Sequence, residues 1–374
     1  MCFLWYWPAG GWDVDRWKKA HPWEPIRSEQ SDHKELLPIS GDITREQWEA
    51  QRARWKGIAD RLLGTLTDKP PATMRHEFLT DPLERPGAAA DDKTVVMRRL
   101  RFPLTDQEWG YAWLLTPKDD RTTPRPAVIA LHQTVMQGKN EPVGLEGQPG
   151  YPSGMDYGLK LARQGFAVLA PDAIAFGERA ADHSNTFYRS ADQFFAAHPE
   201  GSVMGKMMYD VSRAVDLLQT LPAIDMDRIG CAGHSHGAYG TLFAMLGDER
   251  LKAGFISCGL TMLRSDPKPQ RWWRLTALIP RLSFYEKAIE QTPIDYHLLL
   301  ALIAPRPLYI SAGLKDAIFP KTDNLPGVME MVKPIWNLYG AGEMFRHRIY
   351  DGPHDFPKES QDGAFKLLRD AMMT

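Results

Sequence analysis

A serine lies between two histidines and two glycines in residues 233–237, whose sequence is GHSHG. An apolar run at 229–232 precedes this segment and small residues follow it, which predicts a strand, a sharp turn and a helix. Such a turn strains its central residue, so the positions two before and two after it must lack bulky side chains. Gly233 and Gly237 meet this requirement, and Ser235 is therefore predicted to be a nucleophile presented at the end of a strand.

An aspartate and a histidine follow Ser235 in an order that suits them to activate it. Residues 306–313 read as a short buried strand that ends in a glycine turn, and Asp316 lies in that turn. Residues 346–350 are strand-like and lead to His354. This chain order, with each residue just past a strand, is typical of α/β-hydrolases rather than of chymotrypsin or subtilisin. His354 would take the Ser235 proton during attack on an ester carbonyl, and Asp316 would fix the imidazole tautomer.

Each member of this triad also has a purely structural interpretation. A serine in a tight turn is usually a turn residue. Asp316 could be a solvated loop carboxylate, with Asp351 or Asp355 in its catalytic role, and His354 could be a surface histidine. All three residue types occur in the expected chain order, each just past a strand, and this agreement favours the triad.

Catalysis by Ser235 also needs backbone N–H groups aimed at the developing oxyanion. His236 should supply one donor, because it follows the nucleophile at the amino end of a helix. Residues 126–131 read as an earlier strand, and the loop after it should supply the second donor from Gln133, with Thr134 as the alternative. His132 is interpreted as a packing residue of that loop.

The chain resembles bacterial α/β-hydrolases related to dienelactone hydrolases and acetyl xylan esterases over about residues 95–374. The resemblance implies a serine ester hydrolase with the doubly wound fold and no cofactor. It departs from the dienelactone hydrolases at Ser235, where those enzymes carry a cysteine, and this favours ordinary esters. The segments that carry the resemblance are 131–134, 138–145, 170–172, 176–179, the turn at 233–237, and 303–307.

Several residues near the predicted oxyanion hole could bind substrate. Lys139 and Glu141 lie in the same loop as Thr134, and all three could line the pocket. The alternative is that Lys139 and Glu141 pair with each other or with solvent.

Two insertions are expected at about 178–203 and 260–296, where they would form a lid or wall over the site. The second carries Trp272 and Trp273, whose rings could stack on a sugar or an aromatic acid. The alternative is that these tryptophans anchor the insertion.

Residues 1–90 are predicted to be an N-terminal extension, and residues 91–374 the catalytic domain, with 85–90 as the linker. A capping box at Thr44 and Gln47 predicts the start of an amphipathic helix that packs on the catalytic domain. The first 23 residues hold five tryptophans, which indicates an arm that is pinned down or joins a partner surface. The apolar face of the helix comprises Trp48, Trp55, Ala59, Leu62 and Leu66.

The rest of the chain alternates between strands and helices after an antiparallel hairpin at 95–102 and 108–115. Residues 166–170 read as a strand and 204–221 as an amphipathic helix whose methionines belong to the core. We therefore predict an α/β-hydrolase fold, which is a doubly wound, mostly parallel sheet with helices on both faces. The site should lie outside the carboxyl ends of the strands.

Composition limits the possible partners. The chain of 374 residues has 45 basic and 47 acidic residues, and this balance argues against a nucleic-acid-binding protein. No stretch approaches the ~20 apolar residues of a membrane span.

Residues 1–8 make a poor signal peptide, which favours a cytoplasmic location, or a secreted or periplasmic one if a signal was removed. Cys231 and Cys258 are expected to be buried free thiols, and neither a metal nor a cofactor is expected.

The favoured function is hydrolysis of short-acyl, acetyl-like esters, including those of carbohydrates, through an acyl-enzyme on Ser235. A dienelactone-type or other small-molecule lactone hydrolase is the alternative within this class. A metal-dependent hydrolase that uses His234 and His236 is a second alternative, although side chains that flank a sharp turn should diverge. A noncatalytic binding relative is a third. The sequence leaves a homo-oligomer open.

Overall fold

The computed structural model describes residues 12–26, 43–79, 92–145, 154–180, 187–274 and 277–373. Its centre is a nine-stranded sheet with the order β1-β2-β3-β5-β4-β6-β7-β8-β9. Neighbouring strands from β5 through β4 to β9 are parallel, whereas β1, β2 and β3 form an antiparallel edge. The strands are β1 (Glu77–Phe78), β2 (Val95–Pro103), β3 (Trp109–Pro117), β4 (Arg125–Leu131), β5 (Ala167–Pro171), β6 (Ile224–His234), β7 (Leu251–Ser257), β8 (Leu308–Gly313) and β9 (Phe345–Tyr350).

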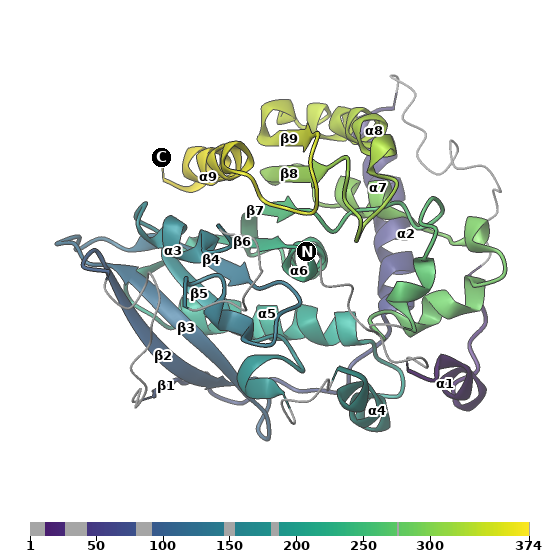
Figure 1. Ribbon diagram of the computed structural model, residues 1–374, viewed down its shortest axis with the longest axis horizontal. Coiled ribbons are helices and arrows are strands. Elements are labelled where there is room, and N and C mark those ends of the chain that lie inside the picture. The colour runs from purple at the N-terminus through teal and green to yellow at the C-terminus, as the bar shows by residue number, and fades with distance from the viewer. Residues whose placement is uncertain are drawn as a thin grey trace.

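Helices cover both faces of the sheet (Figure 1). One core cluster joins the sheet to α3 and α9, and the other joins it to the remaining helices. Because both faces are covered, β4, β5 and β8 are buried along their whole length, as expected for parallel strands. The helices are α1 (Val14–Ala20), α2 (Arg45–Leu63), α3 (Tyr157–Ala162), α4 (Phe187–Ala197), α5 (Val203–Gln219), α6 (His236–Gly247), α7 (Tyr296–Ala301), α8 (Leu325–Asn337) and α9 (Lys358–Met372).

The N-terminal helix α2 begins at the predicted capping box. Thr44 accepts a hydrogen bond from the Gln47 N–H, and the Gln47 side chain accepts one from the Thr44 N–H. Four of the five residues of the predicted apolar face are buried in the core, and Leu66 is partly buried against it. The helix therefore packs on the sheet domain, as predicted. The predicted linker at 85–90 lies outside the described residues, so the domain boundary stays a prediction.

The described part of the tryptophan-rich arm is pinned down. Trp12 stacks on Phe195 of α4 at a ring-centroid distance of 4.5 Å, and Trp17 packs against the same ring at 5.8 Å. Trp23 contacts Phe284 at 5.5 Å. The arm thus joins the two insertions, because Phe195 belongs to the first and Phe284 to the second. Trp5 and Trp7 lie outside the described residues.

The two predicted insertions pack onto the core, and their role as a lid or wall over the site stays a prediction. The first contributes α4, and the second contributes short 3₁₀ turns between β7 and α7. Trp272 and Trp273 of the second insertion are only 1% and 0% exposed. They anchor the segment, which is the alternative considered above, and neither ring presents a face to solvent.

The predicted alternation of strands and helices, the hairpin and the mostly parallel sheet are confirmed. No helix in the described ranges has both the length and the apolar character needed to cross a membrane.

Candidate active site

Ser235 occupies the turn between β6 and α6 with a strained backbone. Its φ is 56° and its ψ is −113°, a region that side-chain-bearing residues rarely adopt. The residue is 7% exposed. The strand, sharp turn and helix predicted around the GHSHG segment are thus present.

The two glycines of the turn are required by close backbone approaches. A Cβ atom on Gly233 would lie 2.2 Å from the carbonyl oxygen of Gly237. A Cβ atom on Gly237 would lie 2.0 Å from the carbonyl oxygen of Leu131, at the end of β4. Both distances are far below any real contact, so this turn can form against β4 only with glycine at both positions.

His236 begins α6, where the first N–H groups of a helix have no acceptor within the helix. Its ring stacks on that of His132 at 5.9 Å and contacts Phe176 at 5.1 Å. His132 donates from Nδ1 to the Gln133 carbonyl and accepts at Nε2 from the Ala173 N–H, which agrees with a packing role. Burial lowers the pKa of both histidines, so both are neutral near pH 7.

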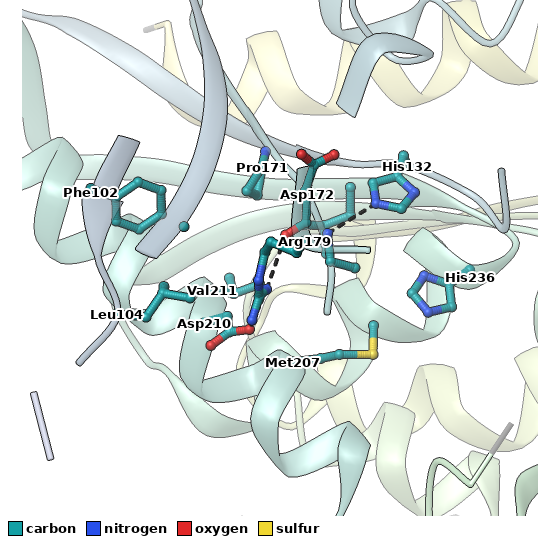
Figure 2. A pocket seen from close by; sticks show the side chains of 13 residues that line it. Phe102, Leu104, His132, Pro171, Asp172, Arg179, Met207, Asp210, Val211 and His236 are labelled. Atoms are coloured by element: carbon teal, nitrogen blue, oxygen red, sulfur yellow. Dashed lines mark hydrogen bonds and ion pairs between the residues drawn. The ribbon is translucent and has the colours of Figure 1, made fainter. Parts of the chain in front are cut away.

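A small pocket of about 30 Å³ adjoins these two histidines (Figure 2). Its apolar lining includes Leu131, Phe102 and Met207. Arg179 crosses one side and pairs with Asp210 at 2.7 Å. The space can hold a water molecule or a very small group.

The Gln133 amide is directed at Glu141. Its backbone N–H donates to Glu141 Oε2 at 3.3 Å, and its side-chain amide donates to Oε1 at 2.6 Å. The Gln133 N–H could therefore reach an oxyanion only by exchanging this bond. Its oxyanion role stays a prediction, and Thr134 stays the alternative.

Glu141 and Lys139 do not pair with each other. Burial raises the pKa of Glu141 to about 7, against the hydrogen bonds from Gln133, which lower it. The Lys139 ammonium lies 2.5 Å from Asp172 and 2.6 Å from Glu178. Both side chains are buried and engaged with the protein, so their contacts support a role in holding the loop after β4 rather than in lining an open pocket.

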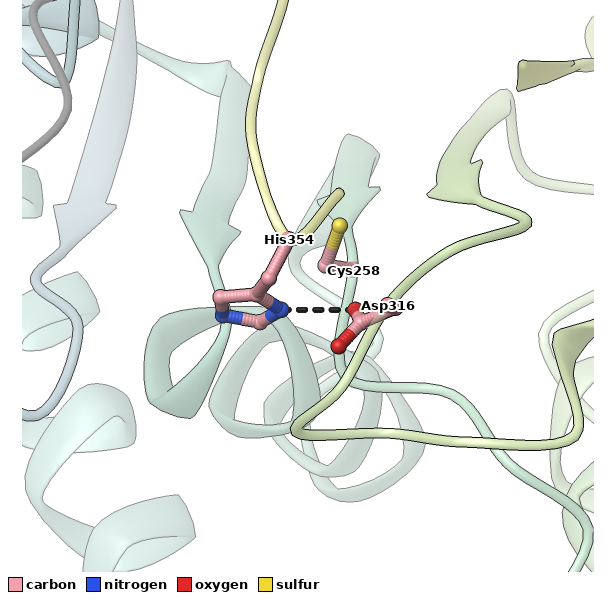
Figure 3. Close-up of side chains that lie close together, drawn as sticks. All are labelled: Cys258, Asp316 and His354. Atoms are coloured by element: carbon pink, nitrogen blue, oxygen red, sulfur yellow. Dashed lines mark hydrogen bonds and ion pairs between the residues drawn. The ribbon is translucent and has the colours of Figure 1, made fainter. Parts of the chain in front are cut away.

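His354 and Asp316 form a hydrogen-bonded pair at the carboxyl edge of the sheet (Figure 3). The His354 Nδ1–H donates to Asp316 Oδ2 at 2.6 Å. Ser235, Asp316 and His354 follow β6, β8 and β9, whose carboxyl ends meet at one edge because these strands are parallel. The His354 ring lies 4.7 Å from that of His234, the residue before Ser235.

Asp316 is the one of the three candidate acids that contacts His354 in the described residues. Its other oxygen accepts hydrogen bonds from the N–H groups of Ile318 and Phe319, both at 2.8 Å. Asp351 instead pairs with Lys315 on the surface, and Asp355 accepts a bond from the next residue's N–H. The carboxylate of Asp316 is thus fixed in orientation, with one oxygen left for the imidazole.

The second nitrogen of His354 is poised to accept a proton. Nε2 is buried and has no hydrogen-bond partner in the described part of the chain. In the neutral imidazole, Nδ1 carries its proton toward Asp316 and Nε2 presents a lone pair. Burial lowers the pKa of His354, but the hydrogen bond to Asp316 and the adjacent Cys258 sulfur outweigh it and leave the pKa raised. The Phe319 ring stacks on the imidazole at 5.7 Å and limits its movement.

The two histidines that flank Ser235 diverge. The His234 ring is buried beside His354 and lies 2.9 Å from the Ser257 hydroxyl, whereas His236 faces His132. Neither belongs to a group of three potential metal ligands in the described residues. The geometry therefore gives no support to a metal site built on this pair.

Sequence reasoning missed two neighbours of the candidate base. Cys258 follows β7, between the strands that carry Ser235 and Asp316, and its place in the strand order was the available signal. Phe319 lies three residues after Asp316 in a loop with no regular pattern, so no sequence signal identified it.

No protein-family model matches this chain. It is 27% identical to a protein of Bacillus subtilis named "Putative hydrolase YtaP", over 76% of this chain and 88% of that protein. It is 26% identical to a 4-O-methyl-glucuronoyl methylesterase of Podospora anserina, over 46% of this chain and 39% of that protein. The chain thus spans most of the first relative and well under half of the second.

Among solved structures, a CE15 glucuronoyl esterase from Teredinibacter turnerae superposes with a TM-score of 0.68 at 17% identity. The match covers 96% of this chain and 98% of that structure. At this identity the likeness establishes the fold. The predicted α/β-hydrolase fold and the predicted resemblance to esterases of that fold are both confirmed.

Proposed function

We propose that this protein hydrolyses carboxylic esters through an acyl-enzyme formed on Ser235. One observation carries the proposal: a strained serine after β6 shares a sheet edge with a partly buried histidine whose Nδ1 is bonded to Asp316. The free lone pair on His354 Nε2 is the group that a serine nucleophile needs as its base.

In the proposed first step, the Ser235 hydroxyl attacks the ester carbonyl and His354 Nε2 takes its proton. Asp316 stabilises the imidazolium through the 2.6 Å hydrogen bond at Nδ1. His354 then returns the proton to the leaving alcohol, and an acyl-enzyme remains on Ser235. A water molecule, activated by the same histidine, releases the acid and restores the serine.

The oxyanion formed in both steps needs donors that are in place beforehand. The N–H of His236 is the first candidate, since it lies at the amino end of α6, where the helix dipole also favours negative charge. The loop after β4 would supply the second donor, from Gln133 or Thr134. Loss of one such donor typically lowers kcat by ~10²–10³-fold.

The proposed substrate is an ester of a carbohydrate. Two relatives support this class: one is named a 4-O-methyl-glucuronoyl methylesterase, and the structural neighbour is named a glucuronoyl esterase. Their names direct attention to esters in which the sugar supplies the acid, in addition to the acetyl-like esters expected from the sequence.

The test compares wild-type protein with Ser235→Ala on para-nitrophenyl acetate, para-nitrophenyl butyrate and the methyl ester of glucuronic acid, each with and without a chelator. Ser265→Ala, a substitution of an exposed serine, is the matched control. We expect activity that survives chelation and falls by ~10³-fold or more in Ser235→Ala alone. Activity that Ser235→Ala retains would refute the proposal. The ratios among the three esters would identify the preferred acid.

A further inference from the structure

Cys258 places a thiol beside the candidate base and acid, although the proposed hydrolysis has no step for it. It follows β7, is 1% exposed and has a φ of 53°. Its Sγ lies 3.4 Å from the Asp355 carbonyl oxygen and 3.8 Å from the Tyr350 hydroxyl. Neither contact is a strong hydrogen bond, because a thiol is a weak donor and acceptor.

Cys258, Asp316 and His354 form the only group of three potential metal ligands found in the described residues. One donor atom from each, namely a sulfur, a carboxylate oxygen and an imidazole nitrogen, lies within 4.8 Å of the other two. Figure 3 shows the thiol and the carboxylate on the Nδ1 side of the imidazole. The three residues follow the adjacent strands β7, β8 and β9, so the sheet itself brings them together.

This donor set suits a thiophilic divalent cation. Zinc binds thiolate sulfur at about 2.3 Å and imidazole nitrogen or carboxylate oxygen at about 2.0–2.2 Å. In a tetrahedral site these bond lengths put the ligand atoms about 3.3–3.6 Å apart. Cation binding would therefore have to replace the 2.6 Å hydrogen bond between His354 Nδ1 and Asp316 Oδ2 and widen that separation by about 0.7–1.0 Å, while separations near the 4.8 Å limit contract by about 1 Å. Three protein ligands leave one position open for water, as in sites that exchange their metal.

We propose that Cys258, His354 and Asp316 bind a thiophilic divalent cation, such as Zn²⁺ or Cd²⁺, and that the bound cation inhibits the enzyme. The cation takes the Nδ1 lone pair of His354, so the ring proton moves to Nε2, where it occupies the lone pair that would accept the Ser235 proton. The Cys258 thiol loses its proton to solvent as it becomes a thiolate ligand. A second proton leaves His354 wherever the imidazole was protonated beforehand, so each cation bound releases one or two protons, and no group is oxidised or reduced.

Cation binding and enzyme inhibition can be tested separately, because only the inhibition experiment rests on the proposed function. The probe for binding is Cd²⁺, whose bond to a thiolate produces an ultraviolet charge-transfer absorption band that does not require an active enzyme. All measurements use the full chain with Cys2→Ser, because Cys2 lies outside the described residues and is a third thiol. In this background we expect the band to appear with at least one proton released per Cd²⁺.

Two substitutions test which side chains bind. Cys258→Ser should weaken Cd²⁺ binding at least about tenfold and remove the band, and His354→Ala should weaken it while leaving the thiol in place. Cys231→Ser is the matched control, because Cys231 is also buried, and burial raises the pKa of its thiol to about 12. It should leave the band unchanged. Far-ultraviolet circular dichroism checks that each variant is folded, and Cys258→Ala replaces Cys258→Ser if the latter is not.

Inhibition is measured as ester hydrolysis with increasing Zn²⁺, followed by a chelator. We expect reversible inhibition in the background and in Cys231→Ser, and at least about tenfold more Zn²⁺ for the same inhibition of Cys258→Ser. Mg²⁺ should not inhibit, because it prefers oxygen ligands. A band that persists in both Cys258 variants, no band in the background, or equal inhibition by Mg²⁺ would overturn the proposal. An inactive chain that still shows the Cys258-dependent band would instead count against the proposed hydrolysis.

Discussion

The burial of Glu141 predicts that stability falls as the pH rises, and that Glu141→Gln removes this pH dependence. Burial raises the pKa of Glu141 from 4.5 to about 7 in the folded protein. Between these pH values the folded state holds a proton that the unfolded state has lost. The stabilisation present below pH 4.5 is therefore lost as the pH rises through 7, and the loss amounts to about 3 kcal/mol.

Glu141→Gln keeps the shape of the side chain but cannot ionise. The new amide oxygen can still accept the 2.6 Å bond from the Gln133 side chain, whereas its NH₂ group cannot accept the 3.3 Å bond from the Gln133 N–H. Loss of that long bond should cost about 1 kcal/mol. The variant should thus be about 1 kcal/mol less stable than wild type at pH 4.5 and about 2 kcal/mol more stable at pH 8.

Urea denaturation of both proteins at the two pH values measures this change of sign. Because every other titrating group is present in both chains, the difference between them isolates Glu141. Glu343→Gln makes the same substitution at an exposed position and controls for the chemical change itself. If Glu141→Gln alters the free energy of unfolding equally at pH 4.5 and pH 8, the buried carboxylate does not titrate as argued.

Four further predictions concern the candidate site and the N-terminal helix. kcat/KM should rise with pH, with its midpoint above pH 6.5, because the raised pKa of His354 shifts formation of the neutral imidazole to higher pH; a midpoint below pH 6.5 would contradict the raised pKa. Asp316→Asn should lower kcat by ~10⁴-fold. Gly237→Ala should lower the free energy of unfolding by at least about 2 kcal/mol and abolish hydrolysis, because the new Cβ atom would clash with the Leu131 carbonyl oxygen. An active and stable variant would show that the turn can relax. Thr44→Ala should cost about 1 kcal/mol in urea denaturation by removing the cap of α2, with kcat unchanged.

The predictable parts of this protein are those that a short window of sequence determines. The GHSHG turn was identified because two glycines, an apolar strand and a small-residue helix start lie within about a dozen residues. The capping box of α2 was equally local, since Thr44 and Gln47 bond to each other. The carboxyl-edge position of Ser235, Asp316 and His354 followed from the strand alternation, because parallel strands end at a common edge.

Sequence could not identify which aspartate contacts His354, because that choice depends on contacts between distant segments. Asp316, Asp351 and Asp355 all lie in loops at the same edge of the sheet. Only the three-dimensional path of the β8 and β9 loops decides that Asp316 receives the Nδ1 proton of His354 and that Asp351 faces Lys315. Sequence could place the candidate catalytic groups near one another, but it could not orient them.

The buried partners of Lys139 and Glu141 could not be predicted for the same reason. These contacts also affect how the loop after β4 could position an oxyanion donor. Lys139 meets Asp172 across 33 positions of sequence, and no local pattern announces such a partner. Two buried clamps result, one from Lys139 to the end of β5 and one from Glu141 to Gln133. Since an oxyanion donor is effective only if it is oriented before the charge forms, the Lys139 contact can serve catalysis by fixing the loop, whereas the Glu141 contact must release the Gln133 N–H before that group can act.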